Sequence, residues 1–420
     1  MRSLPGRLLV VGAAAALLLS ACGRADAPAA TGQPSSTVAA TATGTVTMWA
    51  MGAEGDKLGA FVKAFESANP GVTVNVTSIP WNAAHDKIQT AIAGGTTPDI
   101  SMMGTTWMTD FADSFAAVPA GLTSADFFPG ALANGKVKGA NLGLPWYIDT
   151  RLLYYRTDIA AKAGWTKAPT TWDELKQMAS DMKTKGGAKV GINLPAAGSD
   201  SFQATLWMPW SNGADVMNAD GTKWTLDSPQ MVDAYKYLES FFADGSADAN
   251  YDGANTQADF VSGALGMFID GPWNIGGLKD TGGADFASKY ATAVLPTKAS
   301  STAFAGGSNL VVYKGAKNPG AAWALAKWLT DPKVQADFFK LTGDLPAVQS
   351  AWKDPALASD PKLAAFGAQL KDVKSPPNVA TWTHVSAAAD AALESMTRGG
   401  VDPATALANL QKQADQIGVG

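Results

Sequence analysis

Cysteine and histidine are nearly absent from this chain of 420 residues, which has one cysteine, Cys22, and two histidines, His85 and His384. A single cysteine excludes a disulfide within the chain. With so few thiol and imidazole groups, we expect no metal site of the His/Cys kind. A Ser-His-Asp triad would need one of the two histidines, and neither lies in a supporting motif.

Motifs that hold a nucleotide or a nucleophile are missing as well. The sequence contains no G-x-x-x-x-G-K-S/T, no H-E-x-x-H and no G-x-S-x-G. These absences argue against a nucleotide site and a motif-based nucleophile. Aspartate and glutamate are plentiful, at 37 residues. An exported glycoside hydrolase with two working carboxylates therefore stays open as the alternative.

Charge is also scarce. Charged residues make up 16% of the chain, against about 25% in an average soluble domain. The formal net charge is −5, and because phosphate binding needs a basic face, we expect no nucleic acid partner. Tryptophan, by contrast, occurs 14 times. Low charge with many indoles favours aromatic faces that contact something neutral.

Long hydrophobic runs are missing too, and the one apolar run, Leu8 to Leu19, is too short for a membrane span. With two arginines before it, it predicts a signal peptide over residues 1–21. The sequence Leu-Ser-Ala-Cys that follows resembles a bacterial lipobox, so Cys22 is expected to carry a lipid that anchors the chain to the outer face of the cell membrane. An ordinary secretory signal with an incidental cysteine is the alternative. Residues 22–44 lack aromatics and predict a flexible linker.

Helix and strand patterns alternate through the remaining chain. VTMWAMG and the alternating VTVNVTSI predict strands, and GDKLGAFVKAFESANPG between them predicts one helix with an apolar stripe. TTWDELKQMASDMKTKGG begins with a capping box, and DSPQMVDAYKYLESFFADG begins with Ser228 as its cap and a proline after it. This order predicts an α/β fold with largely parallel sheets covered by helices.

The stretch LPWYIDTRLLYYR, residues 144–156, holds two of the six arginines of the chain. Read as one strand, it places Tyr147, Asp149 and Arg151 on the same face. A carboxylate and a guanidinium so placed can hold neighbouring hydroxyls, and Tyr147 or Trp146 offers a flat surface to a sugar ring. A structural ion pair among core aromatics is an equally good interpretation. Arg156 lies off this face and is expected to be structural.

Seven segments together resemble the extracellular solute-binding proteins of sugar-binding family 1, the lipoprotein receptors of carbohydrate ABC importers, related to maltose-binding protein. The resemblance covers about residues 45–420, and its segments are MWAMGAEGDKLGAFVKAFESANPGVTVNV, IAGGTTPDISMMGTTWMTDFA, LPWYIDTRLLYYRTDIAAKAG, PTTWDELKQMA, GALGMFIDGPWNI, AGGSNLVV and PPNVATW. In detail it is similar to actinobacterial receptors for α-glucosides. It implies a type II periplasmic-binding-protein fold, two α/β lobes around a ligand cleft. Residues 45–148 and 307–356 would form lobe 1, and residues 149–306 and 357–420 would form lobe 2.

The resemblance also implies ligand-binding residues. Glu54 would lie on a loop after the first strand, Asp149 with Arg151 near the hinge, and Trp273 at a stacking position. The full implied set is Glu54, Gly104, Thr105, Thr106, Trp107, Asp149, Arg151, Gln203, Asp270, Trp273, Gly306, Gly307 and Trp382. The glutamate and tyrosine typical of maltose receptors are not evident near Ser201 and Gln203, so maltodextrin itself is not implied.

The implied function is the capture of a neutral oligosaccharide by a monomer, closure of the two lobes around it, and delivery to the transmembrane subunits of an ABC permease. The resemblance also implies that the chain has no cofactor and no catalytic residue and is not an enzyme. Three alternatives stay open besides the hydrolase. One is a lipoprotein with a structural or adhesive role. The others are receptors for glycerol phosphate or for a polyamine, the first needing more cations than Arg151 and the second using Glu54 and Asp149 with aromatic walls.

Overall fold

The structure is a computed structural model, and it describes Val38, residues 41–251 and residues 253–419. The predicted signal peptide, Cys22 and most of the predicted linker lie outside the described residues. None of the helices in the described part combines membrane-spanning length with an apolar sequence.

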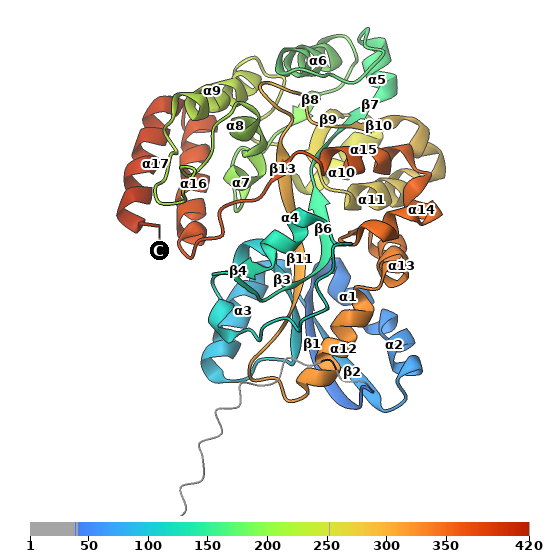
Figure 1. Ribbon diagram of the computed structural model, residues 1–420. Coiled ribbons are helices and arrows are strands. Elements are labelled where there is room, and N and C mark those ends of the chain that lie inside the picture. Colours follow the sequence, from blue (N-terminus) through green and yellow to red (C-terminus); the bar gives the residue numbers. More distant parts are fainter. Residues whose placement is uncertain (1–37, 39–40, 252, 420) are drawn as a thin grey trace, which may run out of the picture. The chain divides into compact units, whose positions relative to one another are not determined.

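Two β-sheets organise the described chain (Figure 1). The larger sheet has the strand order β12-β6-β11-β3-β1-β2, with β13 also beside β11. Its strands are β1 (Gly44–Met51), β2 (Val72–Ile79), β3 (Ile100–Gly104), β6 (Leu144–Thr150), β11 (Ala303–Val312), β12 (Leu345–Pro346) and β13 (Val373–Lys374). The smaller sheet has the order β10-β7-β9-β8. Its strands are β7 (Leu152–Arg156), β8 (Val190–Asn193), β9 (Leu265–Asp270) and β10 (Tyr290–Ala293). A short hairpin joins β4 (Lys136–Val137) and β5 (Ala140–Asn141).

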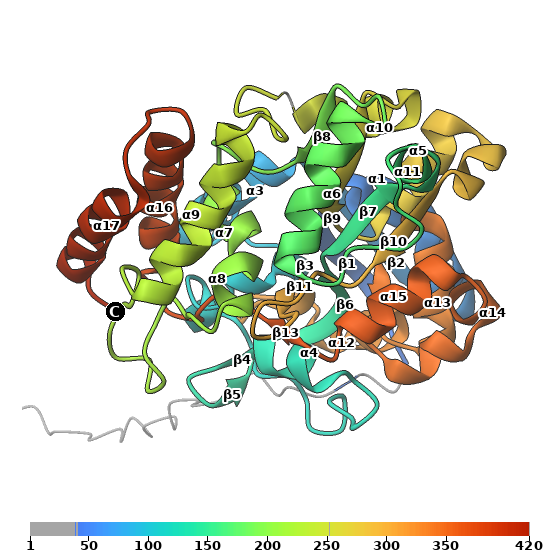
Figure 2. The ribbon, with the colours of Figure 1, turned by 90° about the horizontal axis from the view of Figure 1, so that it is seen from above.

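Helices surround both sheets. The helices within residues 52–134 and 319–358 are α1 (Gly52–Phe61), α2 (Lys63–Ala68), α3 (Trp81–Gly94), α4 (Pro129–Asn134), α12 (Pro319–Leu329), α13 (Pro332–Thr342) and α14 (Pro355–Ala358). The others are α5 (Thr157–Lys162), α6 (Trp172–Thr184), α7 (Ser201–Thr205), α8 (Trp207–Ser211), α9 (Pro229–Ala243), α10 (Thr256–Ser262), α11 (Trp273–Gly282), α15 (Pro361–Gln369), α16 (Trp382–Thr397) and α17 (Pro403–Ile417). Figure 2 shows α16 and α17 side by side next to α9.

Local signals predicted these elements well. The strand predicted at VTVNVTSI is β2, residue for residue. Thr171 caps α6 by accepting a hydrogen bond from the Glu174 N–H, and Ser228 caps α9 in the same way. The single helix predicted after β1 is wrong in one detail, because it breaks at Val62 into α1 and α2. The break is local, since the Val62 N–H still bonds to the Leu58 carbonyl at 2.9 Å.

The prediction of largely parallel sheets is wrong. β1 is parallel to β2 and β3, and β8 is parallel to β9. Strands β6 and β12 are antiparallel to each other, and β11 is antiparallel to β3 and β6. In the smaller sheet β7 is antiparallel to β9 and β10. The pairings of β11 with β6 and β3 join segments about 160 and about 200 residues apart in the chain, and local patterns do not contain that information.

The stretch LPWYIDTRLLYYR is divided between the two sheets. Its first part is β6 in the larger sheet and its second part is β7 in the smaller sheet, with Arg151 as the one residue between them. The chain also joins the sheets between β10 and β11. The lobe boundaries proposed from the sequence, at residues 148/149 and 306/307, fall within β6 and β11, and we keep them as a proposal.

Candidate functional site

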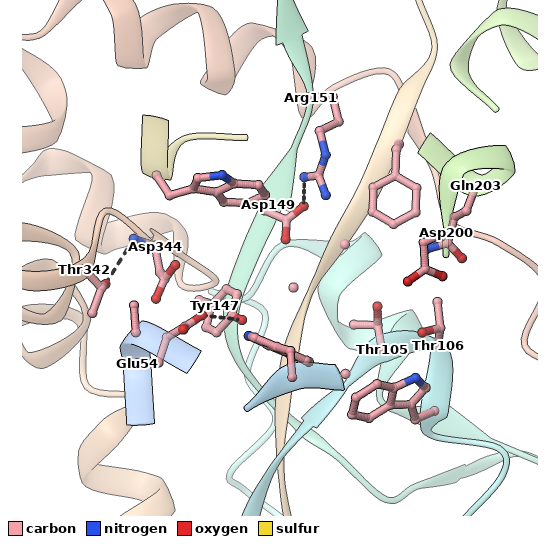
Figure 3. A pocket seen from close by; sticks show the side chains of 18 residues that line it. Glu54, Thr105, Thr106, Tyr147, Asp149, Arg151, Asp200, Gln203, Thr342 and Asp344 are labelled. Carbon is pink, nitrogen blue, oxygen red and sulfur yellow. Dashed lines mark hydrogen bonds and ion pairs between the residues drawn. The ribbon is translucent and has the colours of Figure 1, made fainter. Parts of the chain in front are cut away.

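A cavity of about 530 Å³ gathers side chains that come from both sheets and from the helices that follow their strands (Figure 3). It is lined by Ala53, Glu54, Trp81, Gly104, Thr105, Thr106, Trp107, Tyr147, Asp149, Arg151, Asp200, Gln203, Trp273, Phe304, Gly306, Gly307, Thr342 and Asp344. Its volume is in the range typical of small-molecule sites.

Most of the residues that the resemblance implied as ligand-binding line this one cavity. They are Glu54, Gly104, Thr105, Thr106, Trp107, Asp149, Arg151, Gln203, Trp273, Gly306 and Gly307. They come from sequence positions about 250 residues apart, so the fold brings together a set that the chain keeps far apart. Their role in ligand binding stays a prediction.

Two implied residues, Asp270 and Trp382, do not line the cavity. Asp270 stands behind Arg151, with 3.8 Å between its carboxylate and the Arg151 Nε, and it accepts a hydrogen bond of 2.9 Å from Asn274. Burial raises the pKa of Asp270. Trp382 is 2% exposed and belongs to the core, where its indole N–H donates to Gln203 Oε1 at 3.2 Å. Both therefore support cavity residues and do not face the cavity themselves.

The centre of the cavity holds an ion pair between Asp149 and Arg151. The Arg151 Nη1 donates to Asp149 Oδ1 at 2.5 Å. The guanidinium lies between two aromatic rings, 4.7 Å from the centre of Trp273 and 5.0 Å from the centre of Phe304. Although burial opposes it, the carboxylates of Asp149 and Asp270 raise the pKa of Arg151. Arg151 is therefore a fixed cation, held by Asp149 on Nη1 and near Asp270 on Nε.

Gly306 and Gly307 keep the backbone of β11 close to this pair. A Cβ added to Gly306 would lie 2.8 Å from Asp149 Oδ1. At Gly307, φ is +125°, and an added Cβ would lie 2.3 Å from the Tyr147 carbonyl oxygen. A side chain at Gly307 would therefore have to displace the backbone of strand β6, and one at Gly306 would displace the side chains of Phe304 and Asp149.

One end of the cavity is rich in acceptors, and we call Glu54, Tyr147 and Asp344 the acidic end. Glu54 lies in the first turn of α1 and not on a loop as predicted, because the helix already begins at Gly52. The Tyr147 hydroxyl donates to Glu54 Oε1 at 2.9 Å and accepts from Ser308 Oγ at 3.1 Å. Burial raises the pKa of Glu54, with a smaller contribution from the charge of Asp149. In Figure 3, Glu54, Tyr147 and Asp344 lie together on one side of Asp149.

The opposite end carries two hydroxyls and an amide, which both donate and accept, and one carboxyl group. Thr105 and Thr106, in a 3₁₀ turn after β3, lie there with Gln203 and Asp200 (Figure 3). Asp200 has a φ of +61°, and its N–H donates to Asp390 Oδ2 at 2.9 Å. Burial, and then the charge of Asp390, raises the pKa of Asp200.

Two large indole faces in the cavity lining are open to solvent. Trp81 at the start of α3 is 38% exposed and Trp273 at the start of α11 is 36% exposed. The ring of Trp107 packs edge-to-face against the ring of Trp81, with 5.5 Å between the ring centres and 61° between the ring planes. Exposed indoles of this size bind other flat apolar surfaces, such as the C–H face of a sugar ring.

Sequence reasoning missed part of the lining: Ala53, Trp81, Asp200, Phe304, Thr342 and Asp344. Trp81 had a usable signal, because it follows the carboxyl end of β2, the edge of a parallel sheet where ligands bind. Asp200 adjoins the segment of Gln203, but its left-handed backbone is not visible in the sequence. Asp344 had no signal, since the pairing of β12 with β6 and the packing of α13 on α1 bring it near Glu54.

The cavity contains hydrogen-bonding pairs, aromatic faces and the carboxylates of Glu54, Asp149, Asp200 and Asp344. No group of three or more histidine, cysteine, aspartate or glutamate residues in the described ranges could hold a metal ion. The arrangement suits a polar, uncharged ring compound.

Comparison with known proteins is consistent with this geometry. Residues 60–365 match the family described as bacterial extracellular solute-binding protein. The chain belongs to this family. A binding protein of Brucella abortus is 30% identical over 365 residues, covering 84% of this chain and 88% of the relative. The resemblance found in the sequence is therefore confirmed.

Solved structures of the family share the fold. The sugar-binding protein MalE from Xanthomonas citri is 32% identical, with a TM-score of 0.80 over 89% of this chain and 97% of that protein. The GacH receptor of Streptomyces glaucescens, solved unliganded and with acarbose, is 27% identical, with a TM-score of 0.81 over 89% of this chain and 98% of that protein. The architecture is that of the type II periplasmic binding proteins, as predicted.

Proposed function

We propose that this chain is the substrate-binding lipoprotein of an ABC importer, which captures a neutral disaccharide or short oligosaccharide, with α-glucosides favoured, and delivers it to the transmembrane subunits of the permease. The chain would act as a monomer on the outer face of the cell membrane, held there by a lipid on Cys22. Membership of the solute-binding family supports the capture role. The sugar-binding MalE and the acarbose complex of GacH support a saccharide ligand.

The observation that carries the proposal is the combination of Asp149, Arg151 and Trp273 in one cavity. The ion pair offers acceptors and donors for adjacent hydroxyls, while the indole offers an apolar face of the kind that a sugar ring needs. Asp149 lies on β6 of the larger sheet, whereas Trp273 follows β9 of the smaller sheet. A ligand that touches both therefore favours the closed arrangement of the two lobes.

The experiment is a titration of tryptophan fluorescence with trehalose, maltose, sucrose, cellobiose, chitobiose and a polyamine. We expect one sugar to saturate the signal and to be recovered intact after long incubation with concentrated protein. Recovery of cleaved sugar would favour the hydrolase alternative, and saturation by the polyamine alone would overturn the sugar proposal.

The matched variant is Asp149→Ala, which removes the carboxylate at the centre of the cavity. It should weaken sugar binding by about 10-fold or more, since a hydrogen bond to a charged group is worth about 1.5–3 kcal/mol. Unchanged affinity in this variant would show that the ion pair of Asp149 and Arg151 is only structural.

A further inference from the structure

Asp344 is a buried carboxylate that the fold leaves without a donor on one oxygen. The residue is 7% exposed, it lines the cavity, and its Oδ2 has no hydrogen-bond partner. The neighbouring Thr342 hydroxyl accepts from the Asp344 N–H at 3.1 Å and donates to the Phe338 carbonyl at 2.9 Å. That hydroxyl proton is directed to the Phe338 carbonyl, and Asp344 Oδ2 stays without a hydrogen-bond partner.

The surroundings of Asp344 make this arrangement costly to the ligand-free protein. Glu54 and Asp149, from α1 and β6, face it with like charge, and Lys57 is the nearby cation. The Lys57 Nζ donates to the Leu341 carbonyl at 2.6 Å and forms no ion pair with Asp344. Burial, and then the charge of Glu54, raises the pKa of Asp344 well above its ordinary value. A buried acceptor without a donor destabilises the folded protein, because the hydrogen bonds it made to water are lost and not replaced.

Such a residue is explained if its partner is the ligand. We propose that Asp344 and Glu54 form a subsite at the acidic end of the cavity that accepts hydrogen bonds from two free hydroxyls of an uncharged sugar unit, and that Asp344 thereby determines specificity. This assignment rests on the proposed function.

The chemistry of the acidic end argues for hydroxyl donors over other groups. A carboxylate or phosphate on the sugar would meet the like charges of Glu54, Asp149 and Asp344. An ammonium group brings three donors, but one Glu54 oxygen already accepts from Tyr147, and the cation Lys57 lies nearby. Two hydroxyl donors match the two carboxyl groups, of Glu54 and Asp344, that line this end of the cavity.

The test is Asp344→Asn in the full-length protein, with Asp233→Asn as the matched control. Asp233 is an exposed acid on α9, remote in sequence from the cavity residues. The probe is whichever sugar of the fluorescence panel saturates the wild type. We expect Asp344→Asn to weaken binding of that sugar by at least 10-fold while the melting temperature of the ligand-free protein stays equal or rises. The control should leave both unchanged.

These two readouts separate the explanations. If Asp344 has only a structural role, its replacement should lower both the sugar affinity and the melting temperature. If Asp344 has no role, its replacement should change neither the affinity nor the specificity. Either result overturns the subsite. Saturation of the wild type by spermidine, lost in Asp344→Asn, would assign the subsite to an amine and overturn the hydroxyl assignment. If no panel sugar binds the wild type, the proposed function fails and the subsite fails with it. If the wild type binds and the variant binds equally, the subsite alone fails.

Discussion

Arg151 and Arg156 lie five residues apart in mirrored triplets, Asp149-Thr150-Arg151 and Arg156-Thr157-Asp158. Arg156 is buried and Arg151 is half-buried, both contact the aspartate of their own triplet, and both lie on aromatic rings. Their remaining donors differ. Arg156 makes two bonds to Asp158, of 2.8 and 2.7 Å, and its Nη1 also donates to the carbonyls of Phe260 and Val261.

Arg151 has no such carbonyl partners among the hydrogen bonds of the described chain. It has one hydrogen bond, to Asp149, and a longer contact with Asp270. The same residue types therefore form a structural contact at Arg156, where the guanidinium donors have protein acceptors. At Arg151 they form an ion pair that lines a cavity. The difference lies in whether helix α10 offers its last carbonyls, which no local pattern around either arginine could indicate.

Replacement of Arg156 should have the largest effect. We expect Arg156→Ala to lower the free energy of unfolding by about 2–4 kcal/mol, below the full cost of breaking a buried ion pair because Asp158 is partly exposed. Sugar affinity should stay unchanged. Urea unfolding measures the first quantity and fluorescence titration the second. Arg398→Ala, at an exposed arginine, is the control and should cost less than about 1 kcal/mol. An affinity loss in Arg156→Ala without unfolding would remove the distinction between the two arginines.

Arg151→Lys keeps the charge but removes the planar fork. We expect it to weaken sugar binding by about 30-fold, or roughly 2 kcal/mol, because a single ammonium cannot reproduce two directed donors. The unfolding free energy should change little. Arg156→Lys is the counterpart and should show the reverse, a loss of stability with normal affinity. Equal behaviour of the two lysine variants in both assays would contradict the comparison.

Asp158 and Asp344 should make the free energy of unfolding depend on pH in opposite directions. Although burial opposes it, Arg156 lowers the pKa of Asp158. The stability that Asp158 contributes is therefore fully present above pH 3.8, the ordinary pKa of an aspartate, and is lost as the pH falls through the lowered pKa. The raised pKa of Asp344 has the other sign, since stability is lost as the pH rises above 3.8. Asp344→Asn should therefore stabilise the ligand-free protein at neutral pH by about 1 kcal/mol.

Unfolding titrations of both asparagine variants between acidic and neutral pH measure this difference. The gain from Asp344→Asn should shrink as the pH falls towards 3.8, while the loss from Asp158→Asn should shrink only at still lower pH. Parallel curves would show that Asp344 has a partner that neutralises it.

Trp382→Phe should have the smallest effect on binding. It removes the indole N–H that bonds to Gln203 and leaves the cavity lining intact. We expect the sugar dissociation constant to change by less than about threefold, because the loss of one neutral hydrogen bond reaches the ligand only through Gln203. A change comparable to that of Arg151→Lys in the same titration would place Trp382 in the ligand site after all.

Most of the cavity residues could be predicted from the sequence through the family resemblance, because each of its motifs has a local signature. Glycine pairs, a tryptophan after Gly-Pro and an acid beside an arginine are all visible in the chain. Trp81 and Asp200 were missed although they adjoin such motifs. The lipobox and the signal peptide also rest on local sequence, and both lie outside the described residues.

The sequence by itself determined the local elements: β2, the caps of α6 and α9, and the positions of the glycines at 306 and 307. These depend on residues within a few positions of one another, so short-range periodicity and capping fix them. Only the tertiary structure decided that β6 and β7 belong to different sheets, that Asp344 meets Glu54, and that Arg156 and not Arg151 receives the carbonyls of α10. Those choices depend on antiparallel pairings and packing between segments up to about 290 residues apart, where the free energy comes from contacts that no window of sequence contains.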